Sequence, residues 1–404
     1  MLHFLHISDL HFGRTKHSAL DTDTGLQTSL INDINSLNEA VDIAEREKVD
    51  FIAIAGDVFD KIHVSNAVRK EVAKVFRRIL DRMHLYVIVG THDRAHDKYA
   101  AHTLSDWMNF ADGEGHMSRL HVFDKPTFVH HRDSSGKSQG QIVVLPEPTK
   151  GILEGKTYLE YVDSAMSQMA LDQTAPILVI AHFAVTGAKV GDEQKDVASY
   201  RQKEAVPVSY FDERGYLDYV ALGHIHLRQE LGRTGKVVYP GSMNYCSFTE
   251  LGQQKYVYIV NISDEKVLEK KFVELKSPVP LREIVIDVRG EADPMQKIRD
   301  ELKKAKLSKS IAKISIAVHE SEKNRIDEKQ LKSALKNTIS HSVAWNIDRG
   351  IKMRDATINH DTEERDAYNR YLEILNYPPD ITAEMKAEFE QVLVEYKTKS
   401  DIVE

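Results

Sequence analysis

Aspartate and histidine occur together in five short motifs within the first 226 residues of the chain. These motifs are SDLH (8–11), GDVFD (56–60), GTHD (90–93), AHF (181–183) and GHIH (223–226). Proteins use mixed imidazole and carboxylate ligands for manganese, iron or zinc, whereas calcium and magnesium sites consist almost entirely of oxygen ligands. The motifs therefore predict a centre for transition-metal ions, built from Asp9, His11, Asp57, His92, Asp93, His182, His224 and His226.

Each motif comes directly after a predicted strand. Loops that leave the carboxyl ends of the strands of an α/β sheet converge on one crevice, so we expect the motifs to meet there. Asp9 and His11, like His224 and His226, are two residues apart and point the same way from an extended segment. The carboxylate of Asp57 has two oxygens and can bridge two ions. Two bridged ions activate a water molecule and clamp a phosphoryl oxygen, so the predicted reaction is phosphate-ester hydrolysis.

Each motif alone is weak evidence for a metal centre. A Gly-Asp pair after a strand is usually a turn, and a single histidine is usually a hydrogen-bonded or surface residue. Five motifs, each at a strand end, favour a metal centre over coincidence. The histidines without this context are interpreted as bystanders: His3, His17, His84, His130 and His131.

The elements that position these motifs begin as alternating strands and amphipathic helices. Strands are predicted at 2–7, 51–55 and 85–89, which gives a β-α-β-α-β order and an α/β fold class. The first helix has a stripe of apolar residues from Leu30 to Ala44. The second follows Ser65 as its N-cap and has a stripe from Val68 to Met83. Further strands are expected at 127–131, 141–145, 177–181 and 219–222, and three consecutive antiparallel strands at 236–239, 256–261 and 267–275.

The last third of the chain is expected to be separate from this sheet. Pro278 and Pro280 mark a boundary, after which strands at 284–288, 311–318 and 343–347 alternate with two helices. The first of these helices runs through Met295, Ile298 and Leu302, and the second through Leu331, Leu335 and Ile339. A helical hairpin with aromatic faces follows, with Tyr368, Tyr371, Leu372 and Leu375 on one helix and Met385, Phe389, Val392, Leu393 and Tyr396 on the other. The hairpin is either a tail packed on its own protein or a docking module for a partner helix.

Bulk properties limit the possible classes of protein. The 404 residues exceed what one hydrophobic core usually serves, so two or three domains are expected. Cys246 is the single cysteine, which excludes internal disulfides and zinc clusters held by several thiolates. A formal net charge of -8 argues against binding nucleic acid by bulk electrostatics, although a local basic patch could do so. The start lacks the features of a signal peptide, and no apolar run is long enough to cross a membrane, so we expect a cytoplasmic protein.

Together the five motifs resemble the signature of calcineurin-like metallophosphoesterases. MLHFLHISDLHFGR, IAGDVFD, GHIH and YPGS (239–242) are similar to segments of SbcD-type nucleases, the catalytic subunits of SbcC/SbcD complexes that repair double-strand breaks. The small α/β unit and the hairpin extend the resemblance over essentially the whole chain. It implies a metallophosphoesterase β-sandwich flanked by helices (1–278), an α/β cap that controls access of DNA (279–350), a linker (351–364) and a helical hairpin (365–404).

The resemblance also implies roles for the motif residues. Asp9, His11 and His226 would hold a first ion, Asp57 would bridge, and His182 and His224 would hold a second. His92 would orient the phosphate and protonate the leaving oxygen. The expected ions are two Mn²⁺ per chain, with Mg²⁺, iron and zinc left open. The expected partners are double-stranded DNA ends, an SbcC-type ATPase bound through the hairpin and a second copy of the chain in a homodimer, at the nucleoid of the cytoplasm. Lys303, Lys304, Lys306 and Lys309 of the cap would contact phosphates or form a solvated helix face.

Thr91 departs from the pattern, because the family has Asn at this ligand position. The Thr hydroxyl is shorter and a weaker metal ligand than an amide oxygen. Three interpretations stay open: a variant that binds both ions, a variant with weakened affinity for the second ion, or a scaffold subunit with a defective metal site. A further alternative is a phosphodiesterase or phosphatase that acts on small molecules, which the same motifs would serve and which the acidic net charge slightly favours.

Overall fold

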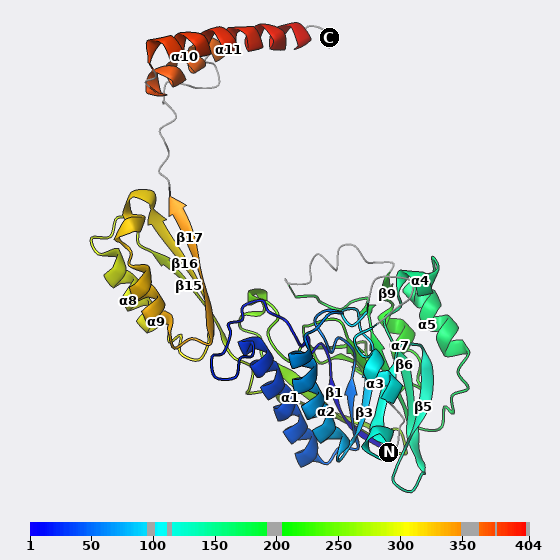
Figure 1. Ribbon diagram of the computed structural model, residues 1–404. Coiled ribbons are helices and arrows are strands. Elements are labelled where there is room, and N and C mark those ends of the chain that lie inside the picture. The colour runs from blue at the N-terminus through cyan, green and yellow to red at the C-terminus, as the bar shows by residue number, and fades with distance from the viewer. Residues whose placement is uncertain (95–101, 111–114, 192–203, 349–362, 376–377, 401–404) are drawn as a thin grey trace.

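Two six-stranded sheets packed face to face form the larger part of the protein (Figure 1). The structure, a computed structural model, describes residues 1–94, 102–110, 115–191, 204–348, 363–375 and 378–400. The first sheet has the order β14-β13-β1-β2-β3-β4 and the second the order β11-β12-β10-β7-β6-β5. In both sheets neighbouring central strands are parallel and the borders include antiparallel strands. The predicted α/β class is confirmed.

The strands of both sheets are short and well defined. The first sheet contains β1 (Leu2–Ile7), β2 (Phe51–Ile54), β3 (His84–Ile88), β4 (Leu120–Phe123), β13 (Tyr256–Ile262) and β14 (Leu268–Glu274). The second contains β5 (Thr127–Arg132), β6 (Ser138–Leu145), β7 (Ile177–His182), β10 (Tyr219–Gly223), β11 (Gln229–Leu231) and β12 (Val237–Tyr239). A two-stranded ladder joins β8 (Ala184–Val185) and β9 (Ala205–Val206).

The central strands are apolar on both faces because each sheet is covered on both sides. Phe4 of β1 stacks on Phe51 of β2 between the two sheets, with ring centroids 4.9 Å apart. Leu5 points to the other face, where α1 (Thr28–Glu47) and α2 (Asn66–Leu80) cover the first sheet. The outer face of the second sheet is covered by α5 (Tyr158–Ser167) and α7 (Val208–Asp212). The resulting order of layers is helix, sheet, sheet, helix.

Short helices and caps complete the sandwich. Ser65 caps α2 as predicted, since its hydroxyl accepts a hydrogen bond from the backbone N–H of Val68. Met83 of the predicted stripe lies beyond the end of α2 but is still buried. The remaining short elements are α3 (Ser105–Phe110), α4 (Lys150–Leu153) and the 3₁₀ turns η1 (Gly115–Arg119), η4 (Phe248–Glu250) and η5 (Glu320–Arg325).

The prediction of three consecutive antiparallel strands at 236–275 is wrong for the first of them. β12 pairs with β10 in parallel and with β11 in antiparallel orientation, all in the second sheet. β13 crosses to the first sheet, where it lies antiparallel between β1 and β14. The reason is that both β12 and β13 are apolar and buried, so their patterns do not distinguish the two sheets.

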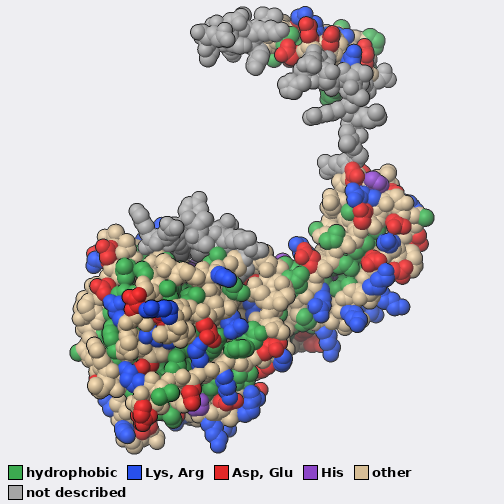
Figure 2. Space-filling model, turned by 180° about the vertical axis from the view of Figure 1, so that it is seen from behind, with side chains coloured by type: hydrophobic (Ala, Val, Ile, Leu, Met, Phe, Trp, Pro, Cys, Tyr) green, Lys and Arg blue, Asp and Glu red, His purple; other side chains and the backbone are tan. Residues whose placement is uncertain are grey.

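A smaller α/β unit follows the sandwich. Its parallel sheet has the order β15 (Leu281–Asp287), β16 (Ile311–His319) and β17 (Ser340–Asp348). The helices α8 (Pro294–Lys304) and α9 (Glu328–Leu335) pack on it through a core of their own, and Ile339 of the predicted second helix lies beyond α9. Lys303, Lys304, Lys306 and Lys309 are exposed, and Figure 2 shows Lys and Arg side chains gathered over the lower part of this unit.

The C-terminal helices α10 (Glu364–Leu375) and α11 (Pro379–Ser400) contact each other through an aromatic pair. Tyr368 stacks on Phe389 with ring centroids 4.0 Å apart, and Arg365 forms an ion pair with Glu390. Tyr371 of the predicted stripe is instead half-exposed. The predicted linker at 351–364 falls almost entirely on residues outside those described. Within the described part of the chain, none of the helices combines the length and the apolar character needed to cross a bilayer.

Candidate metal centre

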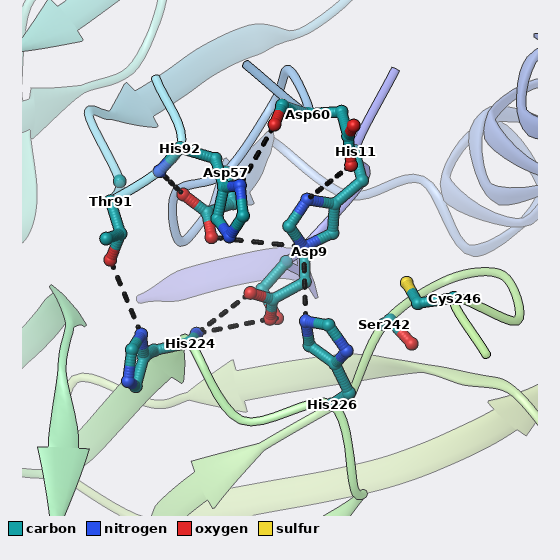
Figure 3. A network of polar contacts seen from close by, with 12 residues as sticks. Asp9, His11, Asp57, Asp60, Thr91, His92, His224, His226, Ser242 and Cys246 are labelled. Atoms are coloured by element: carbon teal, nitrogen blue, oxygen red, sulfur yellow. Dashed lines mark hydrogen bonds and ion pairs between the residues drawn. The ribbon is translucent and has the colours of Figure 1, made fainter. Parts of the chain in front are cut away.

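The five motifs lie together at the carboxyl ends of five parallel strands, where the two sheets adjoin (Figure 3). Asp9 and His11 follow β1, Asp57 follows β2, Thr91 and His92 follow β3, and His182, His224 and His226 come from β7 and β10. Hydrogen bonds from backbone N–H groups to carboxylates hold the motifs together, both between the two sheets and within the first sheet. The N–H of His224 donates to Asp9 Oδ1 at 2.9 Å, and the N–H of His92 donates to Asp57 Oδ1 at 2.8 Å.

The ring nitrogens and carboxylates of these motifs form two adjoining groups. In the first, His11 Nε2 faces His226 Nε2 at 3.1 Å. In the second, His182 Nε2 lies 3.2 Å from Asp57 Oδ2. Ligand atoms of Asp9, Asp57 and His182 all lie within 4.8 Å of one another, and all three residues are buried. Such a spacing allows common ligands of neighbouring ions.

The backbone at these positions adopts a conformation that non-glycine residues rarely take. Asp9, His11 and Asp57 have φ values of 53°, 49° and 52°, and His224 has a φ of 94°. A left-handed conformation costs roughly 1–3 kcal/mol for each such residue and is concentrated at functional sites. Four of the predicted ligands therefore carry strain that the surrounding fold must offset.

Glycines beside the motifs make room for the polar groups. A Cβ on Gly56 would lie 2.3 Å from His182 Nδ1, and the φ of Gly56 is +86°. A Cβ on Gly90 would lie 2.3 Å from the backbone nitrogen of Asp57. The glycines of the GD and GTHD motifs are therefore required by the close approach of neighbouring strands.

Two of the histidines have a defined tautomer because one ring nitrogen faces a carbonyl oxygen. His182 Nδ1 donates to the backbone oxygen of Ala55 at 2.7 Å, which leaves Nε2 toward Asp57. His92 Nδ1 donates to the backbone oxygen of Asp60 at 2.9 Å, and the side chain of His92 is exposed. A carbonyl partner of this kind orients metal-binding imidazoles and raises their basicity.

The electrostatics of the centre combine burial with opposite charges. Burial lowers the pKa of His182, but the Asp57 carboxylate outweighs this effect and raises the pKa to about 10. Burial likewise acts to raise the pKa of Asp57, yet His182 and the other imidazoles bring it well below its usual range. The pKa of Asp9 is raised by burial, and that of His11 is lowered by burial. Binding of a cation to these groups therefore displaces protons.

The donor set fits a divalent metal ion. Nδ1 of His11 is buried and has no hydrogen-bond partner among the described residues, with the nearest ionic contact to Asp60 Oδ1 at 3.7 Å. Buried polar atoms without a partner are rare and call for an explanation, such as a bound ion. Mixed carboxylate and imidazole ligands match the preference of manganese, iron and zinc.

Comparison with known families identifies the larger unit. Residues 2–228 match the family model described as calcineurin-like phosphoesterase. The chain belongs to this family. The chain is also similar to the SbcD component of the SbcCD nuclease of Escherichia coli K12, with 25% identity over 316 residues, which cover 74% of either chain. The SbcD component of Staphylococcus epidermidis is 26% identical over 64% of this chain and 67% of the relative. An uncharacterized metallophosphoesterase of Bacillus subtilis, YhaO, is 26% identical over 65% of this chain and 58% of the relative.

Thr91 lies at the second group of this phosphoesterase centre. Its Oγ1 is 3.4 Å from His224 Nδ1, and the rings of His182 and His224 have centroids 5.4 Å apart. The hydroxyl therefore points toward the imidazole of His224 (Figure 3). The structure thus brings together every residue that the sequence singled out as a candidate ligand.

Sequence reasoning missed the roles of two residues of the phosphoesterase centre. Asp93 accepts hydrogen bonds from the backbone N–H groups of Gly90, Val58 and Phe59, so it ties the GTHD turn to the GDVFD loop. Burial raises the pKa of Asp93 to about 6. Cys246 lies beside His11 and His226, four residues after the YPGS segment. The sequence marks Asp93 only as part of the GTHD motif and does not indicate that it accepts these backbone hydrogen bonds, and nothing local in the sequence marks Cys246.

Proposed function

We propose that this phosphoesterase is a metal-dependent DNA nuclease that hydrolyses phosphodiester bonds during the processing of double-strand breaks. The observation that carries the proposal is the meeting of all five strand-end motifs in one buried carboxylate and imidazole centre. The similarity to the SbcD component of an SbcCD nuclease over about three quarters of the chain favours DNA as the substrate. The proposal includes exonuclease and endonuclease action at the nucleoid of the cytoplasm, in repair, recombination and replication.

We assign the ligands to two ions as the family resemblance implies, with Asp9, which lies near Asp57 and His182, given to the first ion. Asp9, His11 and His226 would hold the first ion, Asp57 would be shared between the two, and Thr91, His182 and His224 would hold the second. The contact between His11 and His226 at 3.1 Å and that between Asp57 and His182 at 3.2 Å support this division. When bound, two divalent ions such as Mn²⁺ would supply a water molecule of lowered pKa and would neutralise charge on the phosphoryl group.

His92 is the proposed catalytic residue of the chain. Its Nδ1 donates to the Asp60 carbonyl, so the proton that it can give away is the one that Nε2 carries in the imidazolium form, and the side chain is exposed. The ring lies close to that of His11, with centroids 4.8 Å apart. In this position His92 orients the phosphate and donates a proton to the oxygen that leaves.

The small α/β unit and the hairpin supply the proposed contacts with DNA and with an SbcC-type ATPase. The exposed lysines of the unit, Lys303, Lys304, Lys306 and Lys309, are suited to phosphate contacts that carry no sequence preference. On the hairpin, Tyr371 and Val392 are 52% and 61% exposed and offer apolar surface to a partner helix. We assign residues 1–278 to catalysis, 279–350 to the cap, 351–364 to a linker and 365–404 to docking.

A homodimer through α2 is part of the proposal. An apolar groove with a volume of about 420 Å³ lies on this helix beside Trp107. It is lined by Ala73, Phe76, Arg77, Leu80, Trp107, Gly115, Met117 and Leu120. A mostly apolar groove on an outer helix is suited to association with a second copy.

Thr91 favours one competing function, a scaffold subunit whose second metal position is defective. The Thr hydroxyl reaches to 3.4 Å from His224, which supports a working position, but it is a weaker ligand than an amide oxygen. The metal content of the purified chain separates the two functions. A value near two ions per chain supports the nuclease, and a value near zero supports the scaffold.

The deciding experiment is degradation of linear double-stranded DNA by the purified chain in Mn²⁺, alone and with its ATPase partner. Asp57→Asn should lower the rate by more than about 100-fold, because it removes the bridging carboxylate. Asp23→Asn, at an exposed turn, is the matched control and should leave the rate unchanged. Hydrolysis of small phosphodiesters without cleavage of DNA would show instead that the chain acts on small molecules.

A further inference from the structure

Cys246 lies at the edge of the first group of the centre. Its Sγ and one ring nitrogen each of His11 and His226 lie within 4.8 Å of one another. The two imidazoles face each other through Nε2 atoms 3.1 Å apart, and Figure 3 shows Cys246 on the side of His226. The thiol therefore belongs to a cluster of three groups that can bind a metal ion, and it is not an isolated cysteine.

The ring of His11 provides independent support for a cation in this cluster. His11 is 2% exposed, and its Nδ1 lies toward Asp60 Oδ1 at 3.7 Å, so Nε2 is the nitrogen that faces the cluster. Its Nε2 faces a second imidazole nitrogen, an arrangement in which only one of the two atoms can donate. A cation between the imidazoles satisfies both nitrogens at once.

The side chain of Cys246 is held in place from two directions. Arg14, itself buried, donates from Nη1 to Sγ at 2.7 Å and pairs with Asp33 at 3.3 Å. On the backbone side, the carboxylate of Glu250 accepts the N–H of Cys246 at 2.8 Å. A group fixed in this way loses little freedom when it binds a ligand.

We propose that Cys246 supplies a sulfur ligand to the first metal ion, an inference that rests on the proposed function. When the sulfur binds, the S–H bond breaks, the proton passes to solvent and a bond between sulfur and metal forms. Thiolate is a soft ligand that favours Zn²⁺ and Fe²⁺ over Mn²⁺. The second group offers only carboxylate, imidazole and hydroxyl. The two positions therefore differ in metal preference, and the first takes a thiophilic ion.

The test is titration of the metal-free, full-length chain with Co²⁺ alone, followed by competition with Zn²⁺ and Mn²⁺. Because Cys246 is the single cysteine, a charge-transfer band from sulfur to cobalt in the near ultraviolet reports on this residue alone. The band is expected in the unaltered chain and in His182→Ala, which changes only the second group. It should be absent from Cys246→Ser, whose Zn²⁺ affinity should fall roughly 10- to 100-fold while its Mn²⁺ affinity changes little.

Two outcomes overturn the proposal in different ways. If Co²⁺ binds to the unaltered chain and the band is absent, Cys246 only anchors Arg14, and the proposed nuclease function stands. If neither Co²⁺ nor Mn²⁺ binds, the sulfur ligand and the metal-dependent function fail together. The spectrum of the unaltered chain decides the matter even if Cys246→Ser does not fold, which circular dichroism would show.

Discussion

Histidines gather at both ends of the central strands, and the two clusters differ in their neighbours. At the carboxyl ends, His182 lies beside the carboxylate of Asp57, which raises the pKa of the imidazole to about 10 against the effect of burial. At the amino-terminal end of β3, the rings of His84 and His121 stack with centroids 5.3 Å apart. Nearby, His131 forms a hydrogen bond with the hydroxyl of Tyr86, and its ring packs on that of Phe51.

The cluster of His84, His121 and His131, here called the far cluster, shows how buried histidines behave without a strong opposite charge beside them. Burial lowers the pKa of His131 to about 3 and that of His84 to about 4, so both rings are neutral near pH 7. None of the far-cluster histidines has a φ in the left-handed region among the described residues, whereas His11 and His224 do. In these two clusters, the histidines that lie beside carboxylates are the candidate metal ligands, whereas the buried histidines without such neighbours act as aromatic core residues.

The largest predicted effect is the loss of activity in His92→Ala, which changes the histidine cluster at the carboxyl ends of the strands. Loss of the proton donor should lower kcat roughly 10²- to 10⁴-fold on DNA. The metal content should stay at the value of the unaltered chain, since His92 is assigned to no ion. The matched control is His63→Ala, an exposed histidine nearby that should leave kcat unchanged. A parallel loss of bound metal would instead make His92 a ligand.

Added metal should stabilise the protein through the cluster at the carboxyl ends of the strands, and the far cluster should not contribute to this gain. At Mn²⁺ concentrations about 100 times Kd, the free energy of unfolding should rise by ~2.7 kcal/mol. Calorimetry should show this gain in the unaltered chain and in His84→Gln. The gain should shrink in His182→Ala, which removes a ligand. Equal loss of the gain in both variants would contradict the distinction between the two clusters.

Substitution of Thr91 is expected to change the affinity for the second metal ion by a smaller factor, and the affinity can be either raised or lowered. Thr91→Asn supplies an amide oxygen and should tighten binding of the second ion by about 10-fold, whereas Thr91→Val removes the hydroxyl and should weaken it by a similar factor. Isothermal titration with Mn²⁺ measures both changes. Identical affinities in all three chains would mean that position 91 holds no ligand.

The smallest effect on activity is expected from the far cluster, whose histidines influence only the stability of the protein in acid. Because the pKa of His131 is lowered to about 3 in the folded chain, the unfolded chain takes up a proton below pH 6.5 that the folded chain does not. The stability is therefore complete above pH 6.5 and decreases by up to ~1.4 kcal/mol per pH unit between pH 6.5 and about 3. His131→Gln should reduce this slope in urea unfolding and leave DNA cleavage at pH 7 unchanged. An unaltered slope would show that other groups control acid sensitivity.

Local patterns in the sequence predicted the parts of the fold that depend on local interactions. β1 spans Leu2–Ile7 as predicted, and α2 begins after Ser65 because capping involves only neighbouring residues. The sheet in which β12 lies could not be predicted, since burial on both faces removes the alternation that would assign it. The short strand β4, with only partial burial on one side, was not recognised at all.

The same difference between local and long-range interactions applies to the candidate site. The Asp and His residues were found because each follows a strand, and parallel strands bring their ends together. The neighbourhood of Cys246 could not be predicted, because the thiol reaches His226 only through the path of the chain after β12. The direction of the Thr91 hydroxyl likewise depends on the contact between the two sheets, which no single segment encodes.

The groups at the metal centre are spread from Asp9 to His226, and β1 is bordered by β13 at Tyr256–Ile262. During synthesis from the N-terminus, the complete set of groups is available only after more than half of the chain has left the ribosome. The strand that secures β1 emerges later still. A chain that ends before His226 therefore lacks part of this centre.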